Sequence, residues 1–142
     1  MEQEKKSSIP VAVIVIIAII IMIPICGIIA AIAIPSFIKY RNKSIEKLVI
    51  TNAEILRDSV EVYRAKSDQD VYPSNVDDPE FILLENPINE YEQAIIAGDQ
   101  QPPSIDKSLE GCVYYYLYPD KRDYTIVGYG LGGEPIITIK PN

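Results

Sequence analysis

The stretch "GIIAAIAIPSFIKYRNKS", residues 27–44, joins an apolar segment to a basic one at a single proline, Pro35. Upstream of this proline, no residue from 9 to 34 is charged, which gives 26 uncharged residues in a row. As a helix they would be roughly 39 Å long, and about 20 residues are enough to cross the hydrocarbon core of a bilayer. The stretch therefore predicts a membrane helix that runs directly into a charged helix.

The apolar segment is predicted to be a retained transmembrane helix over residues 9–35, after a short N-terminal tail over residues 1–8. Pro10 lies near its start, where a missing N–H costs little, and the interior Pro24 predicts a kink. A cleaved secretory signal is the alternative. The uncharged run is too long for such a signal, and Ile25 is too bulky for the small residue that cleavage before Cys26 would need.

Residues 36–66 contain neither proline nor glycine and are predicted to continue the helix as an amphipathic rod. We expect Pro35 to bend this rod without ending it, because it removes one backbone hydrogen bond. Charged side chains mark the solvated face, in the pairs Glu54/Asp58 and Arg57/Glu61. The apolar residues recur at steps of three or four, as on one face of a helix: Ile45, Val49, Ala53, Leu56, Val60 and Tyr63.

The rest of the chain is predicted to be a variable region over residues 67–108 and an antiparallel β-meander over residues 109–142. In the variable region, "FILLENP" (81–87) could be a strand or a single helical turn, and "NEYEQAIIAG" (89–98) a short helix closed by Gly98. The meander is predicted from three runs rich in Tyr, Val and Ile that are separated by turns, at 111–118, 124–130 and 135–140.

A small sheet has an apolar face that needs a cover, and the amphipathic helix is the long element available to provide it. The predicted fold class is therefore α+β. It has a long N-terminal helix whose first half spans the membrane and whose amphipathic second half packs on a C-terminal antiparallel sheet of about three strands.

Charge is spread unevenly along the chain, which has a net charge of −7. Residues 39–66 carry a net charge of +3 and residues 67–142 a net charge of −10. So acidic a body argues against nucleic acid as a partner, because phosphates must be neutralised by Lys and Arg. There is no histidine, and neither a phosphate-binding loop nor a metal-ligand motif is recognisable. We therefore expect no enzyme activity, no catalytic residues and no cofactor.

The opening stretch and this layout resemble the type IV pilin and type II secretion pseudopilin family. "VYPS" (71–74) is similar to the Tyr-Pro that follows the helix in many members, and "YTIVGYGLGGEPI" (124–136) resembles the closing hairpin of pseudopilin sheets. The residues that fall in register with the family signature, and that the resemblance implies for helix–helix packing and assembly, are Gly27, Ala30, Ala31, Ala33, Pro35 and Phe37.

The resemblance implies a pilin-like structural subunit or accessory of a type IV pilus or type II secretion-type system. Such subunits are held in the bacterial inner membrane as single-pass proteins, with the C-terminal domain extracytoplasmic, or at the cell surface once in a filament. The implied partners are the membrane, and further copies or other pilin-like subunits that associate through the N-terminal helix. Counting Lys and Arg alone predicts the opposite orientation, because Lys39, Arg41, Lys43 and Lys47 outnumber Lys5 and Lys6.

The chain departs from the family pattern at two positions. In the register set by Pro35, the leader-cleavage glycine of the family falls at Val13 and the glutamate of its apolar run falls at Ala18. In the family, that glutamate is thought to pair with the N-terminal amine of a neighbouring subunit. A second hypothesis is therefore a non-polymerising, single-pass, membrane-anchored interaction or binding protein built on a pilin scaffold.

Two local patterns each have two interpretations. The small residues Gly27, Ala30, Ala31 and Ala33 favour close approach of a second helix, although any apolar sequence would serve as a plain anchor. An acidic turn region could suggest a calcium site, although such turns are usually only solvated. Its residues are Asp68, Asp70, Asp77 and Asp78.

The tyrosine run at 114–116 is expected to pack rather than to bind a ligand. Successive residues of a strand face opposite sides, so Tyr115 should lie opposite to Tyr114 and Tyr116, with one side in the core. Cys112 is expected to be a small buried residue, and it is not expected to pair with Cys26, which lies in the apolar segment.

Overall fold

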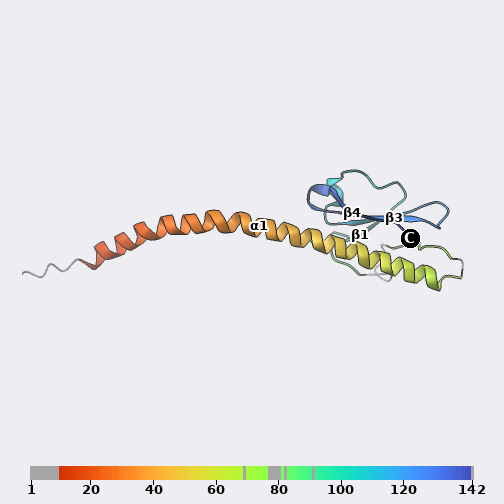
Figure 1. Ribbon diagram of the computed structural model, residues 1–142, viewed down its shortest axis with the longest axis horizontal. Helices are drawn as coiled ribbons and strands as arrows, with labels where there is room; N and C mark the ends of the chain where they lie inside the picture. Colours follow the sequence, from red (N-terminus) through yellow and green to blue (C-terminus); the bar gives the residue numbers. More distant parts are fainter. Residues whose placement is uncertain (1–9, 69, 77–80, 82, 91, 142) are drawn as a thin grey trace, which may run out of the picture. The chain divides into compact units, whose positions relative to one another are not determined.

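The computed structural model describes residues 10–68, 70–76, 81, 83–90 and 92–141. Its elements are one long helix, α1 (Val11–Lys66), and four strands, with two short 3₁₀ turns at Lys107–Leu109 and Leu131–Gly133. The chain divides into two compact units, Met1–Tyr40 and Arg41–Asn142. The first half of α1 belongs to the first unit, and the second half belongs to the second unit together with the sheet, which we call the body (Figure 1).

Helix α1 passes through both of its internal prolines, Pro24 and Pro35, without ending. A proline in a helix removes one backbone hydrogen bond, and the rest of the ladder continues on either side. Directly after Pro35, the hydroxyl of Ser36 donates a hydrogen bond to the carbonyl of Ile32 at 3.0 Å. The expectation that Pro35 does not end the helix is thus confirmed.

The amphipathic pattern of the second half of α1 is confirmed as far as Val60. Its predicted apolar face is buried at Ile45, Val49, Ala53, Leu56 and Val60. The prediction is wrong at Tyr63, whose side chain remains 46% exposed. Tyr63 has the correct spacing, and the ring of Phe81 lies beside it, with the ring centroids 6.1 Å apart, but this contact does not bury the side chain. Periodicity identifies a helix face, and the length of the covering layer decides where that face stops being buried.

Asn52 is buried on the same face, although it is polar and was not among the predicted core positions. Its Nδ2 donates a hydrogen bond to the carbonyl of Glu85 at 3.0 Å. A buried amide needs such a partner, because an unsatisfied polar group costs free energy. Asn52 therefore attaches the segment around Glu85 to the helix.

The sheet has four strands in the order β1-β2-β3-β4. Strands β2 (Val113–Leu117), β3 (Tyr124–Tyr129) and β4 (Pro135–Ile139) pair antiparallel in sequence order, as the meander predicts. Strand β1 (Ile95–Gly98) pairs parallel with β2, with Ile95 opposite Val113. The sheet is therefore mixed and has one strand more than predicted.

The short helix expected over residues 89–98 is wrong, because its last four residues form β1. Ile95 and Ile96 are β-branched, which favours a strand, and they pair with Val113 and Tyr114 at the edge of β2. Directly before β1, the Val113 N–H donates a hydrogen bond to the Ala94 carbonyl at 2.7 Å. In the run 81–87, Glu85 forms an isolated bridge with Gln93, and the other described residues are in neither helix nor strand.

The two faces of the sheet pack against different partners. On the face toward α1, Ile95, Val113, Tyr115, Tyr124 and Ile126 join the helix residues in one core cluster. On the other face, a smaller cluster contains Leu109, Cys112, Val127 and Tyr129. Tyr115 is buried, whereas Tyr114 and Tyr116 are half-buried, so the predicted alternation along β2 is confirmed.

Gly128 lets α1 approach β3 closely. A Cβ atom at this position would lie 2.9 Å from Val49 Cγ1 and 2.8 Å from Ile137 Cγ2. Real Cβ atoms do not come so close to other carbons, since interiors are already packed at crystal-like density. The glycine therefore leaves the space that the helix side chain occupies.

Candidate functional site

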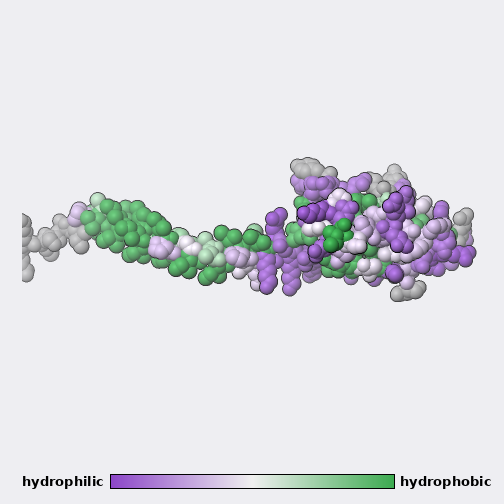
Figure 2. Space-filling view, turned by 90° about the horizontal axis from the view of Figure 1, so that it is seen from above, coloured by the Kyte–Doolittle hydropathy of each residue, from purple (hydrophilic) through white to green (hydrophobic). Residues whose placement is uncertain are grey.

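The first half of α1 exposes its apolar side chains on all sides. Every described residue from 10 to 40 is exposed, and most of them from Val11 to Ile38 are isoleucine, valine or alanine. Figure 2 shows this part of the chain as a mainly hydrophobic surface with a few paler patches, whereas the body is mostly hydrophilic. Among the residues that the structure describes, α1 is the helix long and apolar enough to cross a membrane.

All six predicted assembly residues lie on α1 and are exposed. Gly27, Ala30 and Ala31 share one face, because residues three and four apart are neighbours on a helix. Apart from the adjoining backbone of α1 itself, no atom of the described chain lies within 4 Å of the position that a Cβ on Gly27 would occupy. Phe37 is 69% exposed, at the end of the apolar segment. The helix therefore presents a small-residue surface that nothing in the described part of the chain covers.

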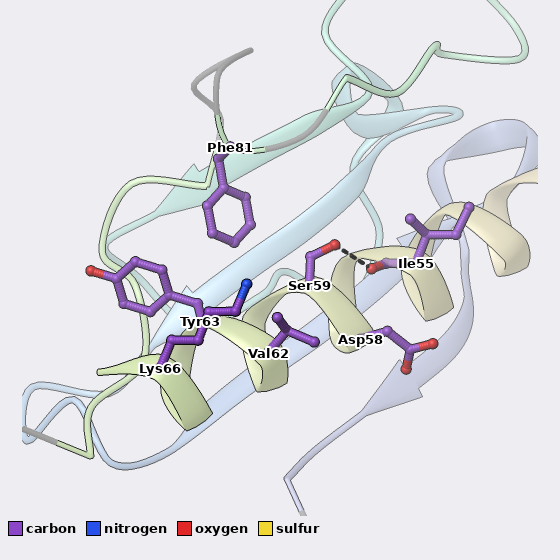
Figure 3. Close-up of a pocket in the computed structure, with 7 residues that line it drawn as sticks. All are labelled: Ile55, Asp58, Ser59, Val62, Tyr63, Lys66 and Phe81. Carbon is purple, nitrogen blue, oxygen red and sulfur yellow. Dashed lines mark hydrogen bonds between the residues drawn. The ribbon is translucent and has the colours of Figure 1, made fainter. Parts of the chain in front are cut away.

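The body has an apolar groove of its own, which we call the helix groove (Figure 3). It has a volume of about 470 Å³ and lies along the last three turns of α1, with Phe81 above it. Its lining residues are Ile55, Asp58, Ser59, Val62, Tyr63, Lys66 and Phe81.

The helix groove has apolar walls and two side chains of opposite charge, Asp58 and Lys66. Ile55 and Val62, seven residues apart, are 40% and 51% exposed. The hydroxyl of Ser59 bonds to the Ile55 carbonyl at 2.9 Å and is thus satisfied within the helix. Apolar residues seven apart, with an acid and a base beside them, are typical of a surface that receives another helix.

Sequence reasoning did not find this groove. Ile55 and Val62 lie outside the predicted apolar face, and Phe81 comes from a segment that had no clear prediction. The exposed seven-residue spacing of Leu48, Ile55 and Val62 was the available signal.

A second hollow of about 470 Å³ is polar and lies between α1 and β4. Its lining residues are Arg57, Glu61, Tyr124, Thr138, Ile139 and Lys140. Arg57 is already paired with Asp58, at 2.7 Å between Nη2 and Oδ1. The sequence placed Glu61 on the solvated face of the helix, and this is wrong, because Glu61 is half-buried and accepts a hydrogen bond from Tyr124 of the sheet.

Glu61 accepts hydrogen bonds from two tyrosines. The hydroxyl of Tyr124 donates to Oε1 at 2.9 Å, and the hydroxyl of Tyr72 lies 3.1 Å from the same oxygen. Arg64 then donates to the Tyr72 hydroxyl at 2.7 Å and to Asp70 Oδ1 at 2.7 Å. This network ties the loop after α1 to the helix and the sheet.

Burial changes the acidity of several groups in the body. It raises the pKa of Tyr115 and Tyr124 above the ordinary value, and a hydrogen bond to Glu61 adds to the effect at Tyr124. Burial also raises the pKa of Cys112 to about 11. The Cys112 thiol donates to the Gln93 carbonyl at 3.2 Å, so it is held as a neutral, buried group, and the prediction that Cys112 is buried is confirmed.

The acidic turn region does not gather ligands in the described part of the chain. The guanidinium of Arg64, which donates to Asp70, lowers the pKa of that carboxyl group. Asp77 and Asp78 lie outside the described residues. Within those residues, there is no group of three or more His, Cys, Asp or Glu side chains that could hold a metal ion.

Comparison with known proteins gives no match. No family model, no curated protein and no solved structure is significantly similar to this chain.

Proposed function

We propose that this chain is a pilin-like structural subunit or accessory of a type IV pilus or type II secretion-type system. It is anchored in a bacterial inner membrane by the first half of α1, with the body on the extracytoplasmic side. One observation carries the proposal: α1 is a single helix that exposes apolar side chains throughout its first half and covers a sheet with one face of its second half. The residues 27–44 add the resemblance to the pilin signature.

In this proposal, the exposed first half of α1 serves both as the anchor and as the surface for association. Small residues let helices approach closely in lipid, where packing rather than water exclusion drives contact. Gly27, Ala30 and Ala31 form the face on which a second helix would pack. The body remains outside the bilayer, where the groove residues Ile55 and Val62 can extend the contact between subunits.

Bulky substitutions on the small-residue face test this proposal. Ala30→Ile and Ala31→Ile together keep the segment apolar, so the protein should stay in the membrane while association between copies falls. The control is Ile28→Leu with Ile32→Leu, which keeps side-chain volume on the same helix. Association is measured as energy transfer between labelled copies in reconstituted vesicles. Equal transfer in both variants would mean that the segment is an anchor only.

The second candidate function is a non-polymerising, membrane-anchored interaction protein. The helix groove favours it, because the groove is an apolar surface in the body, outside the membrane segment. Val13 and Ala18 favour it as well, since the family pattern has glycine and glutamate there. Shearing cells and probing the sheared fraction separates the two functions. A filament subunit appears in that fraction, and an interaction protein remains with the membrane.

A further inference from the structure

Four basic side chains lie within the nine residues 39–47, directly after the apolar segment of α1. We call them the basic band: Lys39, Arg41, Lys43 and Lys47. All four are exposed. Within the part of the chain that the structure describes, none of them forms an ion pair, since the two salt bridges there join Arg57 to Asp58 and Arg64 to Asp70. Their charges are therefore available to an external partner.

The three lysines of the basic band lie on one face of α1, because they are four residues apart. From Lys39 to Lys47 there are eight residue steps, or roughly 12 Å along the helix axis. Lys43 and Lys47 are each two residues from a core residue, Ile45 and Val49, and two residues correspond to about 200° of rotation on a helix. The lysine face is thus turned away from the buried face.

The position of the basic band determines which partner it meets first. Described residues 10–38 are uncharged, and a helix that crosses a bilayer through them brings the next residues to the headgroup layer. That layer is roughly 5 to 8 Å thick on each side of the hydrocarbon core. Long Lys and Arg side chains reach such a layer along their aliphatic stems.

The uneven distribution of charge along the chain also favours the headgroup layer of an anionic membrane as the partner. The segment 39–66 has a net charge of +3, whereas residues 67–142 have a net charge of −10. An anionic surface would attract the basic band and repel the rest of the body. Each Lys or Arg near such a surface contributes roughly a fivefold preference.

We propose that the basic band binds the phosphates of anionic phospholipids where α1 leaves the bilayer. This contact sets the depth of the helix and keeps the acidic part of the body away from the membrane surface. The proposal requires only that α1 crosses a bilayer, and it does not depend on the pilin-like function. An acidic segment of a second copy is the competing partner that the test must separate.

The protein has no tryptophan, so an introduced tryptophan is the single tryptophan donor in an energy-transfer experiment. A donor is introduced by Tyr40→Trp, beside the basic band, and the protein is reconstituted in mixed vesicles of phosphatidylcholine and phosphatidylglycerol. Energy transfer is measured to a trace of dansyl-labelled phosphatidylglycerol and, separately, to dansyl-labelled phosphatidylcholine. We expect several-fold higher transfer to the anionic lipid, and we expect added salt to reduce the difference.

Two further variants assign the effect to the basic band. In the first, the four band residues are replaced by glutamine, and the preference for the anionic lipid should disappear. In the second, four other exposed basic residues outside both the band and the helix groove are replaced by glutamine, so the net charge changes equally and the preference should remain. These residues are Lys107, Lys121, Arg122 and Lys140. Circular dichroism confirms that both variants fold. An unchanged preference in the first variant, or an equal loss in both, would overturn the proposal.

Zero-length carbodiimide coupling, which joins lysine amines to carboxylates, tests the competing partner. If the band bound a second copy, coupling would yield covalent dimers in vesicles of phosphatidylcholine alone, and replacing the band residues would abolish them. That result would overturn the lipid proposal. Dimer yields that do not depend on the band support it.

Discussion

The two halves of α1 differ in apolar content and in the surroundings that each requires. In the first half, isoleucine occupies every side of the helix and is exposed on every side. In the second half, apolar residues on one face are buried against the sheet, while charged residues occupy much of the remainder. A helix that is apolar all round needs an apolar surrounding, whereas an amphipathic helix needs a single covering layer. One continuous helix therefore meets two different requirements.

The largest difference between the halves should appear when a large side chain is truncated. Leu56→Ala removes a fully buried side chain from the core, and we expect a loss of about 2–5 kcal/mol in the free energy of unfolding of the body. Ile29→Ala removes an exposed one and should leave that free energy unchanged. Denaturant unfolding in detergent, followed by tyrosine near-UV circular dichroism, measures both. Equal losses would refute the distinction between the halves.

Adding a methyl group should reveal the same contrast at a smaller scale. At Gly128, a Cβ would press against Val49 and Ile137, so Gly128→Ala should destabilise the body by about 1–3 kcal/mol. At Gly27, the added methyl group meets no atom within 4 Å apart from the adjoining backbone of α1, and the body should not respond. The same unfolding assay applies. If Gly128→Ala is tolerated, α1 and β3 are not closely packed at this point.

A third contrast concerns polar residues on adjacent positions of the second half. Asn52→Ala leaves the carbonyl of Glu85 without its donor, and we expect a loss of about 1–3 kcal/mol. Thr51 is the matched control, since it is exposed and its hydroxyl bonds only to the Lys47 carbonyl one turn back. Thr51→Ala should be close to neutral. Similar effects at both positions would argue against the Asn52 bond as a tertiary contact.

Raising the pH should weaken the body through its buried tyrosines. Burial raises the pKa of Tyr115 and Tyr124, and raises the pKa of Tyr129 to about 12. The folded state thus holds these protons more tightly than the unfolded state, where the tyrosine pKa is about 10. Their stabilising contribution is complete below that pH and is lost progressively above it. Melting temperatures that fall above about pH 10, and fall less in Tyr124→Phe, would agree with this.

The smallest effect is expected at the proline in the opening stretch. Pro35 interrupts one backbone bond in a helix that continues regardless, so Pro35→Ala should barely change retention in the membrane fraction or the stability of the body. Carbonate extraction of membranes, followed by immunoblotting, checks the first point. Loss of insertion in this variant would show that Pro35 is more than an interruption within a continuous helix.

Much of the body was predictable from residue spacing alone. The buried positions from Ile45 to Val60 follow the helical period, and the alternation around Tyr115 follows the strand period. Both periods are local properties, since each side chain's direction depends on its position along the same element. The candidate association residues from Gly27 to Phe37 were likewise chosen from the sequence, and they stay a prediction.

Two of the failed predictions involve a partner outside the residue's own helix or strand. Residues 95–98 form a strand because the edge of β2 pairs with them, and Glu61 is half-buried because Tyr72 and Tyr124 donate to it. No local pattern records either contact. The helix groove arises in the same way, when Phe81 approaches Tyr63 from a separate segment.

The sequence by itself thus determined the long helix, its change from uniformly apolar to two-faced, and the three antiparallel strands that follow. These depend on the order of apolar and polar residues, which is already present in the unfolded chain. Only the tertiary structure decided the parallel fourth strand, the end of the buried face before Tyr63 and the close approach at Gly128. Those features depend on which surfaces meet when the chain packs, and packing brings together residues that the linear order keeps apart.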